Sequence, residues 1–123
     1  DYAPRSELEA WLQSPDAFLI RMVFEEKYRR RMETSFPSKL IEFAQFGKPI
    51  IVWGPEYCSA VQWGSMMKSA LCVSNQNPNA LVVSLVSFAR SSSVRERLAV
   101  AARRAANEEF NPVAIKNVFF RLI

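Results

Sequence analysis

Three short apolar runs, separated from one another by helical patterns, constrain the fold of this chain more than any other feature. They cover residues 17–24 (AFLIRMVF), 50–53 (IIVW) and 70–74 (ALCVS). Each run is short enough to be a buried strand. Strands that alternate with helices pair in parallel through right-handed crossovers. The sequence therefore predicts an α/β fold with a small parallel three-strand sheet and flanking helices.

Helical patterns fill the chain between and beyond these strands. Ser6 and Glu9 have the spacing of a capping box, and Pro15 ends the helix that they begin. We interpret the charged run of residues 25–33 as a loop with room for a helical turn. Later helices are expected over residues 59–68, 81–90 and 94–110, with Gly64 weakening the first of them and Asn111-Pro112 starting a last one.

The length of 123 residues suits one domain and is too short for two. We therefore treat residues 1–123 as a single domain. Both faces of a three-strand parallel sheet need helices, whereas its edges need further strands. A sheet of this size indicates part of a larger unit.

The composition excludes several kinds of chemistry. The chain has no histidine, which removes imidazole metal sites, serine–histidine triads and the commonest general base. We expect no metal site. Cys58 and Cys72 lie in apolar stretches typical of buried free thiols in a cytoplasmic protein. No apolar run approaches the ~18 residues that a membrane span needs.

A net charge of +4 favours contact with anions, and part of that charge is local. Arg29, Arg30 and Arg31 stand together in a run that also holds several acids. One interpretation is a solvated surface on which the charges neutralise one another. The other is a contact for phosphate, an anionic lipid head group or nucleic acid. No zinc-finger spacing or glycine–aromatic RNA-binding pattern supports nucleic acid specifically.

Residues 34–49 (TSFPSKLIEFAQFGKP) also allow two interpretations. Pro37 suits the first position of a helix that begins at Ser35 or Phe36, and Gly47 suits the position after its last turn. The segment is then an ordinary capped helix. Alternatively, the helix N-terminus faces a phosphate at the carboxyl end of a strand. In that case the hydroxyls and the ammonium of residues 34–39 surround the phosphate, and Glu42 accepts hydrogen bonds from sugar hydroxyls.

Residues 34–55 (TSFPSKLIEFAQFGKPIIVWGP) resemble the nucleotide-sugar-binding segment of group 1 glycosyltransferases, which have the two-domain GT-B fold. The positions similar to the family pattern are Phe36, Pro37, Leu40, Glu42, Gly47 and Pro49. Weaker similarity extends over nearly the whole chain. The resemblance implies a Rossmann-like domain of which only the latter half is present.

The resemblance implies a donor site on this segment. In the family, the residue that matches Glu42 contacts the ribose of the donor nucleotide. The positions that match Ser35, Phe36, Pro37, Ser38 and Lys39 lie beside the diphosphate. The first glutamate of the family pattern falls on Thr34, so this chain departs from the pattern there. The implied donor substrate is a nucleotide diphosphate sugar, and no other cofactor is implied.

Three hypotheses on function follow. The first is a glycosyltransferase donor-binding half-domain that is inactive alone, because positioning the donor and the acceptor needs both halves of a cleft. Family members are cytosolic and often contact membranes peripherally. The second is an interaction module that forms homo-oligomers through its exposed sheet edge or apolar helix faces. The third is a weak anion or nucleic-acid binder that uses Arg29 to Arg31.

Overall fold

The computed structural model describes residues 16–110 and has the predicted α/β architecture. Its three strands are β1 (Phe18–Arg21), β2 (Ile50–Trp53) and β3 (Leu71–Val73). They form one parallel sheet in the order β1-β2-β3, with Phe18 opposite Ile50 and Ile51 opposite Leu71. The predicted fold class is therefore confirmed. The helices expected within residues 6–15 and after Asn111 lie outside the described residues.

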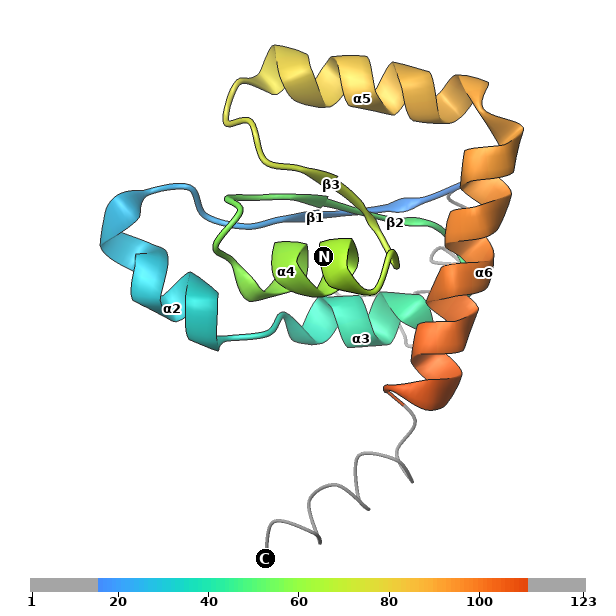
Figure 1. Cartoon of the computed structure of the whole chain (residues 1–123), viewed down its shortest axis with the longest axis horizontal. Coiled ribbons are helices and arrows are strands. Elements are labelled where there is room, and N and C mark those ends of the chain that lie inside the picture. The colour runs from blue at the N-terminus through green and yellow to red at the C-terminus, as the bar shows by residue number, and fades with distance from the viewer. Residues whose placement is uncertain (1–15, 111–123) are drawn as a thin grey trace, which may run out of the picture.

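The helices cover the two faces of the sheet as separate layers (Figure 1). On one face lie α3 (Ser38–Ala44) and α4 (Ser59–Met66), and on the other lies α5 (Pro78–Arg90). The long helix α6 (Ser92–Glu108) runs past one end of the sheet, from the α5 layer to the α3 layer. The connections from β1 to β2 and from β2 to β3 both cross the face covered by α3 and α4. Right-handed connections require this when consecutive strands are added to the sheet in one direction.

Two hydrophobic clusters hold these layers together. Between the sheet and α3 with α4, the buried side chains include Ile20, Leu40, Ile50, Val52 and Ala102. Between the sheet and α5, the buried side chains are Ile51, Phe88 and Leu98. The strand residues alternate between the clusters because successive side chains of a strand point to opposite faces. Helix α6 contributes to both clusters, so it fixes the position of α5 relative to α3.

The charged run forms more helix than expected. It contains a 3-10 turn, η1 (Glu26–Tyr28), followed by the helix α2 (Arg29–Thr34). The prediction of a loop with room for one helical turn was therefore wrong, because most of the run is helical. Arg29 Nε lies 2.7 Å from a carboxylate oxygen of Glu33, one turn later on the same helix face. Pairs at this spacing support a short helix on a surface.

Several predicted boundaries shift by a few residues. Helix α3 begins at Ser38, and Pro37 occupies the N-cap position with extended backbone instead of the first helical position. Helix α5 begins at Pro78 instead of residue 81, because the side chain of Asn77 accepts a hydrogen bond from the Asn79 amide at 2.9 Å. Proline then fits the first turn, where its missing N–H is not needed. Gly47, predicted to cap this helix, lies two residues beyond the C-cap residue Gln45 and has a φ of 65°.

The expectation of two buried free thiols is met in full by Cys58 and in part by Cys72. Cys58 is buried, Cys72 is half-buried, and both are free thiols. Burial raises the pKa of each thiol above its ordinary value. Among residues 16–110, no helix is long and apolar enough to cross a bilayer.

Candidate functional site

The loops that follow the three strands meet at the carboxyl edge of the sheet. The hydroxyl of Tyr57, after β2, lies 3.4 Å from the carbonyl oxygen of Phe24, after β1. The indole N–H of Trp53 donates to the carbonyl oxygen of Asn75, after β3, at 2.8 Å. These contacts hold the edge in one arrangement. In open α/β sheets, ligands bind at this edge.

The predicted donor-site segment lies beside this edge, at the start of α3. The hydroxyl of Ser59, the first residue of α4, donates to the carbonyl oxygen of Ser35 at 2.5 Å. This bond joins the segment before α3 to the start of α4, which directly follows the loop after β2. The loop after β2 in turn contacts the loop after β1, so the start of α3 is anchored to the carboxyl edge.

The six predicted donor-site residues divide into an exposed and a partly buried group. Ser35, Ser38, Lys39 and Glu42 are exposed, whereas Phe36 and Pro37 are half-buried. The aromatic ring of Phe36 packs edge-on against Trp63, with 6.0 Å between ring centroids, and also contacts Phe110. Phe36 therefore anchors the segment to the core, and the exposed side chains remain for a ligand.

The exposed group is arranged as one turn of helix. Ser38 and Glu42 are four residues apart, so they lie on one face of α3, with Lys39 three residues from Glu42. Neither Lys39 nor Glu42 belongs to an ion pair within residues 16–110. The first-turn amides of Ser38 and Lys39 have no backbone acceptor among the described residues. The turn thus combines hydrogen-bond donors, an ammonium and a carboxylate on its solvent-facing side.

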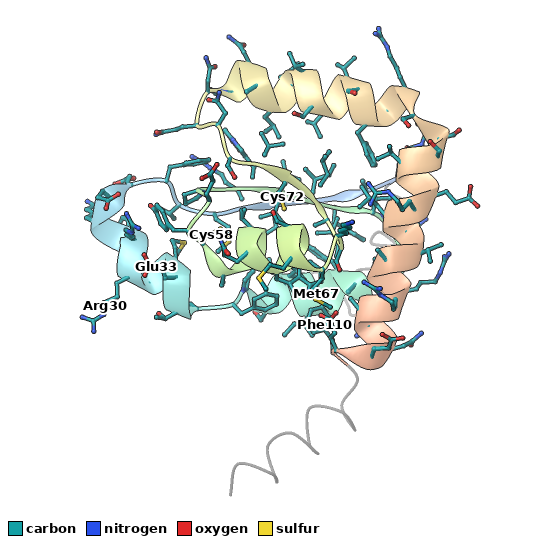
Figure 2. The ribbon with its side chains drawn as sticks, in the orientation of Figure 1. Arg30, Glu33, Cys58, Met67, Cys72 and Phe110 are labelled. Atoms are coloured by element: carbon teal, nitrogen blue, oxygen red, sulfur yellow. The ribbon has the colours of Figure 1, made fainter. Side chains whose placement is uncertain are left out.

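The three consecutive arginines form the first turn of α2, and their surroundings differ. Arg29 is engaged by Glu33 and Glu26, and its guanidinium lies 4.5 Å from the centroid of the Tyr57 ring. The hydrogen bond to Glu33 is the largest cause that raises the pKa of Arg29. Arg30 points away from the rest of the fold into solvent (Figure 2). Successive residues of a helix lie about 100° apart, so the three side chains diverge.

Sequence reasoning missed a hollow at the carboxyl edge, on the α5 side. It has a volume of about 440 Å³, and its lining includes Arg21, Phe24, Trp53, Gln76 and Pro78. The guanidinium of Arg21 lies 5.5 Å from the centroid of the Trp53 ring. The sequence feature that could have indicated this hollow is the arginine that interrupts the first apolar run. None of the six predicted donor-site residues lines this hollow.

The described residues show no grouping of the kind that binds a metal ion. Across residues 16–110, no cluster of three or more histidine, cysteine, aspartate or glutamate side chains comes together. Comparison with protein-family models, curated proteins and solved structures found no match to this chain. The fold defines the class of protein: an α/β domain with an open parallel sheet and a polar turn beside its carboxyl edge.

Proposed function

We propose that this chain is the donor-binding half-domain of a glycosyltransferase that uses a nucleotide diphosphate sugar. The observation that carries the proposal is the exposed turn at the start of α3, which presents Ser38, Lys39 and Glu42 beside the carboxyl edge of the sheet. The sequence of this turn resembles the donor-binding segment of GT-B enzymes. The chemistry of the turn fits a diphosphate joined to a ribose.

Each group has a separate role in this proposal. The amides of Ser38 and Lys39 and the Lys39 ammonium contact the diphosphate, because amides and ammonium groups neutralise its charge. The Glu42 carboxylate accepts hydrogen bonds from the ribose hydroxyls, since an ionised carboxylate is an acceptor only. During transfer of the sugar, the two amides and the Lys39 ammonium stabilise the charge that develops on the leaving nucleotide. Residues outside this chain hold the acceptor and complete the cleft.

An NMR titration tests the proposal. Isotope-labelled protein is titrated with UDP and with GDP, and amide shifts are expected to concentrate on residues 35–42. Glu42→Gln keeps the shape of the side chain but weakens acceptance from two hydroxyls, and should reduce affinity roughly ten-fold. Glu96→Gln is the matched control, because Glu96 is an exposed acid on α6 and the substitution changes the charge equally. Unchanged spectra at millimolar nucleotide, or equal losses in both variants, contradict the proposal.

A second candidate function is self-association, and exposed apolar side chains favour it. On α5, Val82, Val83 and Val86 are 55%, 69% and 42% exposed. Leu19 on the edge strand β1 is 46% exposed. Monomeric proteins seldom leave such groups uncovered together, and an open sheet edge pairs readily with another chain. We propose that two copies meet through these surfaces.

Light scattering over a range of protein concentrations tests self-association. The native chain should show the mass of a dimer at high micromolar concentration. Val83→Ser should shift the equilibrium toward monomer, whereas Val100→Ser, at an exposed valine on α6, should not. A native chain that remains monomeric at all concentrations contradicts this second candidate and leaves the donor-site proposal unaffected.

A further inference from the structure

The hollow at the carboxyl edge of the sheet has no part in the proposed donor site. It lies on the α5 side, and its volume of about 440 Å³ is within the range of small-molecule sites. The segment after β1 and the loop after β3 form its walls, at the end of the sheet away from α6 (Figure 1). Its lining combines aromatic rings with a cation, and this combination indicates what it binds.

Two aromatic rings give the hollow a rigid apolar wall. The rings of Phe24 and Trp53 meet edge to face, with 5.8 Å between their centroids. Both side chains are half-buried, so each ring is partly accessible. The ring of Pro78 also lines the hollow. Rigid rings lose little conformational freedom on binding, and a planar aromatic ring packs well against them.

Arg21 brings a positive charge to the same wall. Its guanidinium lies 5.5 Å from the centroid of the Trp53 ring. Contact with a ring face does not use the N–H donors of a guanidinium, which lie in its plane. Among residues 16–110, no acid forms an ion pair with Arg21. Arg21 can therefore make two parallel hydrogen bonds to a carboxylate or phosphate group.

Hydrogen bonds within the surrounding loop hold the hollow in shape. The indole N–H of Trp53 donates to the carbonyl oxygen of Asn75 at 2.8 Å. The side-chain oxygen of Asn75 accepts from the Asn77 amide at 2.9 Å, and that of Asn77 accepts from the Asn79 amide at 2.9 Å. These bonds fix the loop that carries Gln76. A ligand then meets a preformed site and needs little ordering of the protein.

The charges around the hollow favour an anion. Helix α5 begins at Pro78, so the positive end of its dipole lies at the hollow. Glu25 is the acid in the lining, and its carboxylate lies 3.7 Å from the ammonium of Lys27. Lys27 offsets the charge of Glu25, whereas the charge of Arg21 remains for a ligand.

We infer that this hollow binds a small ligand in which a planar aromatic ring carries an acidic oxyanion, either a carboxylate or a phosphate. The ring packs against Phe24 and Trp53, and Arg21 holds the oxyanion. The side-chain amide of Gln76, also in the lining, supplies a further donor. The inference does not rest on the proposed donor site, because none of the donor-site residues lines the hollow.

An NMR titration with benzoate tests the inference. Benzoate should bind with a Kd of about 1 mM, an ordinary value for so small a ligand. It should shift the amides of residues 21–25 and 75–77 and the indole N–H of Trp53. Benzamide keeps the ring without the charge, and cyclohexanecarboxylate keeps the charge without a planar ring. Each should bind at least about five-fold more weakly than benzoate.

A titration with phenyl phosphate identifies the oxyanion. Phenyl phosphate has the same ring as benzoate, so the tighter binder of the two shows whether the site prefers a phosphate or a carboxylate. Tighter binding by either of them than by benzamide supports the inference.

Substitution of Arg21 separates a defined contact from general attraction. Arg21→Gln should weaken benzoate binding about ten-fold through lost charge-assisted hydrogen bonds, and should leave benzamide binding close to native. Arg97→Gln is the matched control, because it removes an exposed arginine from α6, which passes the opposite end of the strands. The control should bind benzoate as the native chain does.

Two further variants test the ring and the sign of the charge. Phe24→Leu should weaken benzoate binding about five-fold, and should change cyclohexanecarboxylate binding little, because the loss concerns contact between rings. Glu25→Gln should strengthen benzoate binding about two-fold, since it removes a like charge from the lining.

Four results overturn the inference. They are equal binding of benzoate and benzamide, equal losses in the Arg21 and Arg97 variants, no shift of residues 21–25 at about 20 mM benzoate, and tighter binding of benzylamine than of benzoate. The last result would assign the hollow to a cation held by Glu25. Failure of UDP and GDP to shift residues 35–42 would contradict the donor site alone and leave this inference standing.

Discussion

Replacing Gly64 with alanine tests how α4 packs against the sheet. Glycine in the middle of a helix is unfavourable by about 1 kcal/mol relative to alanine, so propensity alone predicts that Gly64→Ala stabilises α4. The structure predicts the opposite. A Cβ atom at this position would lie 2.7 Å from the Cys72 sulfur and 3.1 Å from the Ala70 Cβ. Helix α4 approaches β3 so closely that only glycine fits.

The magnitude follows from these two opposed effects. Insertion of a methyl group into a packed region costs about 1–3 kcal/mol, and the helical gain is about 1 kcal/mol. Gly64→Ala should therefore lower the free energy of unfolding by about 1 kcal/mol. In a Cys72→Ala background the sulfur is gone, and the new Cβ meets only Ala70. The same substitution should then raise the free energy of unfolding by up to about 1 kcal/mol.

Urea denaturation of the four proteins in this double-mutant cycle measures the effect. The expected coupling energy between Gly64 and Cys72 is about 2 kcal/mol, well above the error of such a cycle. Cys58→Ala provides the control background, because the Cys58 sulfur lies beside Gly54 and not beside Gly64. If Gly64→Ala changes the free energy of unfolding equally with cysteine and with alanine at position 72, contact with the Cys72 sulfur is not the reason that glycine is needed at position 64.

Three other outcomes are expected. Gly47→Ala should cost about 1–2 kcal/mol in urea unfolding, because alanine is strained at a φ of 65° and its Cβ would meet Arg103 Cγ at 2.7 Å. Trp63→Phe removes the indole donor 2.6 Å from the Glu109 carboxylate and should cost about 1–3 kcal/mol, with equal stability contradicting the contact. Burial raises the pKa of Cys58 in the folded state, so as pH rises the thiol ionises first in the unfolded state. The free energy of unfolding should therefore fall as pH rises past about 8.5. Cys58→Ala should make the free energy of unfolding less dependent on pH in this range.

The three strands and their parallel pairing could be predicted from the sequence, because each apolar run is short and the runs alternate with helical patterns. Ile50 to Trp53 lies between Gly47-Lys48-Pro49 and Gly54-Pro55, which leaves few alternatives. The extent of α2 could not be predicted in this way. Its stability depends on the Arg29–Glu33 pair and on the contact of Arg29 with Tyr57, which is distant in sequence.

The candidate site was predictable only in part, for a similar reason. The exposure of Ser38, Lys39 and Glu42 follows from the apolar face of α3, which the sequence displays. The hollow beside Arg21 and Trp53 depends on register, since the two residues face each other only because β1 and β2 pair in this alignment. Helical and strand periodicity within one segment does not specify the alignment between two segments.

The packing of α3 explains most of the positions at which this chain resembles the glycosyltransferase segment. Of its matching positions, Leu40 is fully buried, Pro49 is buried and Gly47 is needed for its positive φ. Phe36 packs against aromatic rings of the core. Each of these residues would be retained by any chain that joins such a helix to such a strand, whatever it binds. Glu42 is different, because it is exposed and forms no ion pair among residues 16–110. The fold gives no reason for a carboxylate there, so Glu42→Gln separates the functional part of the resemblance from the structural part.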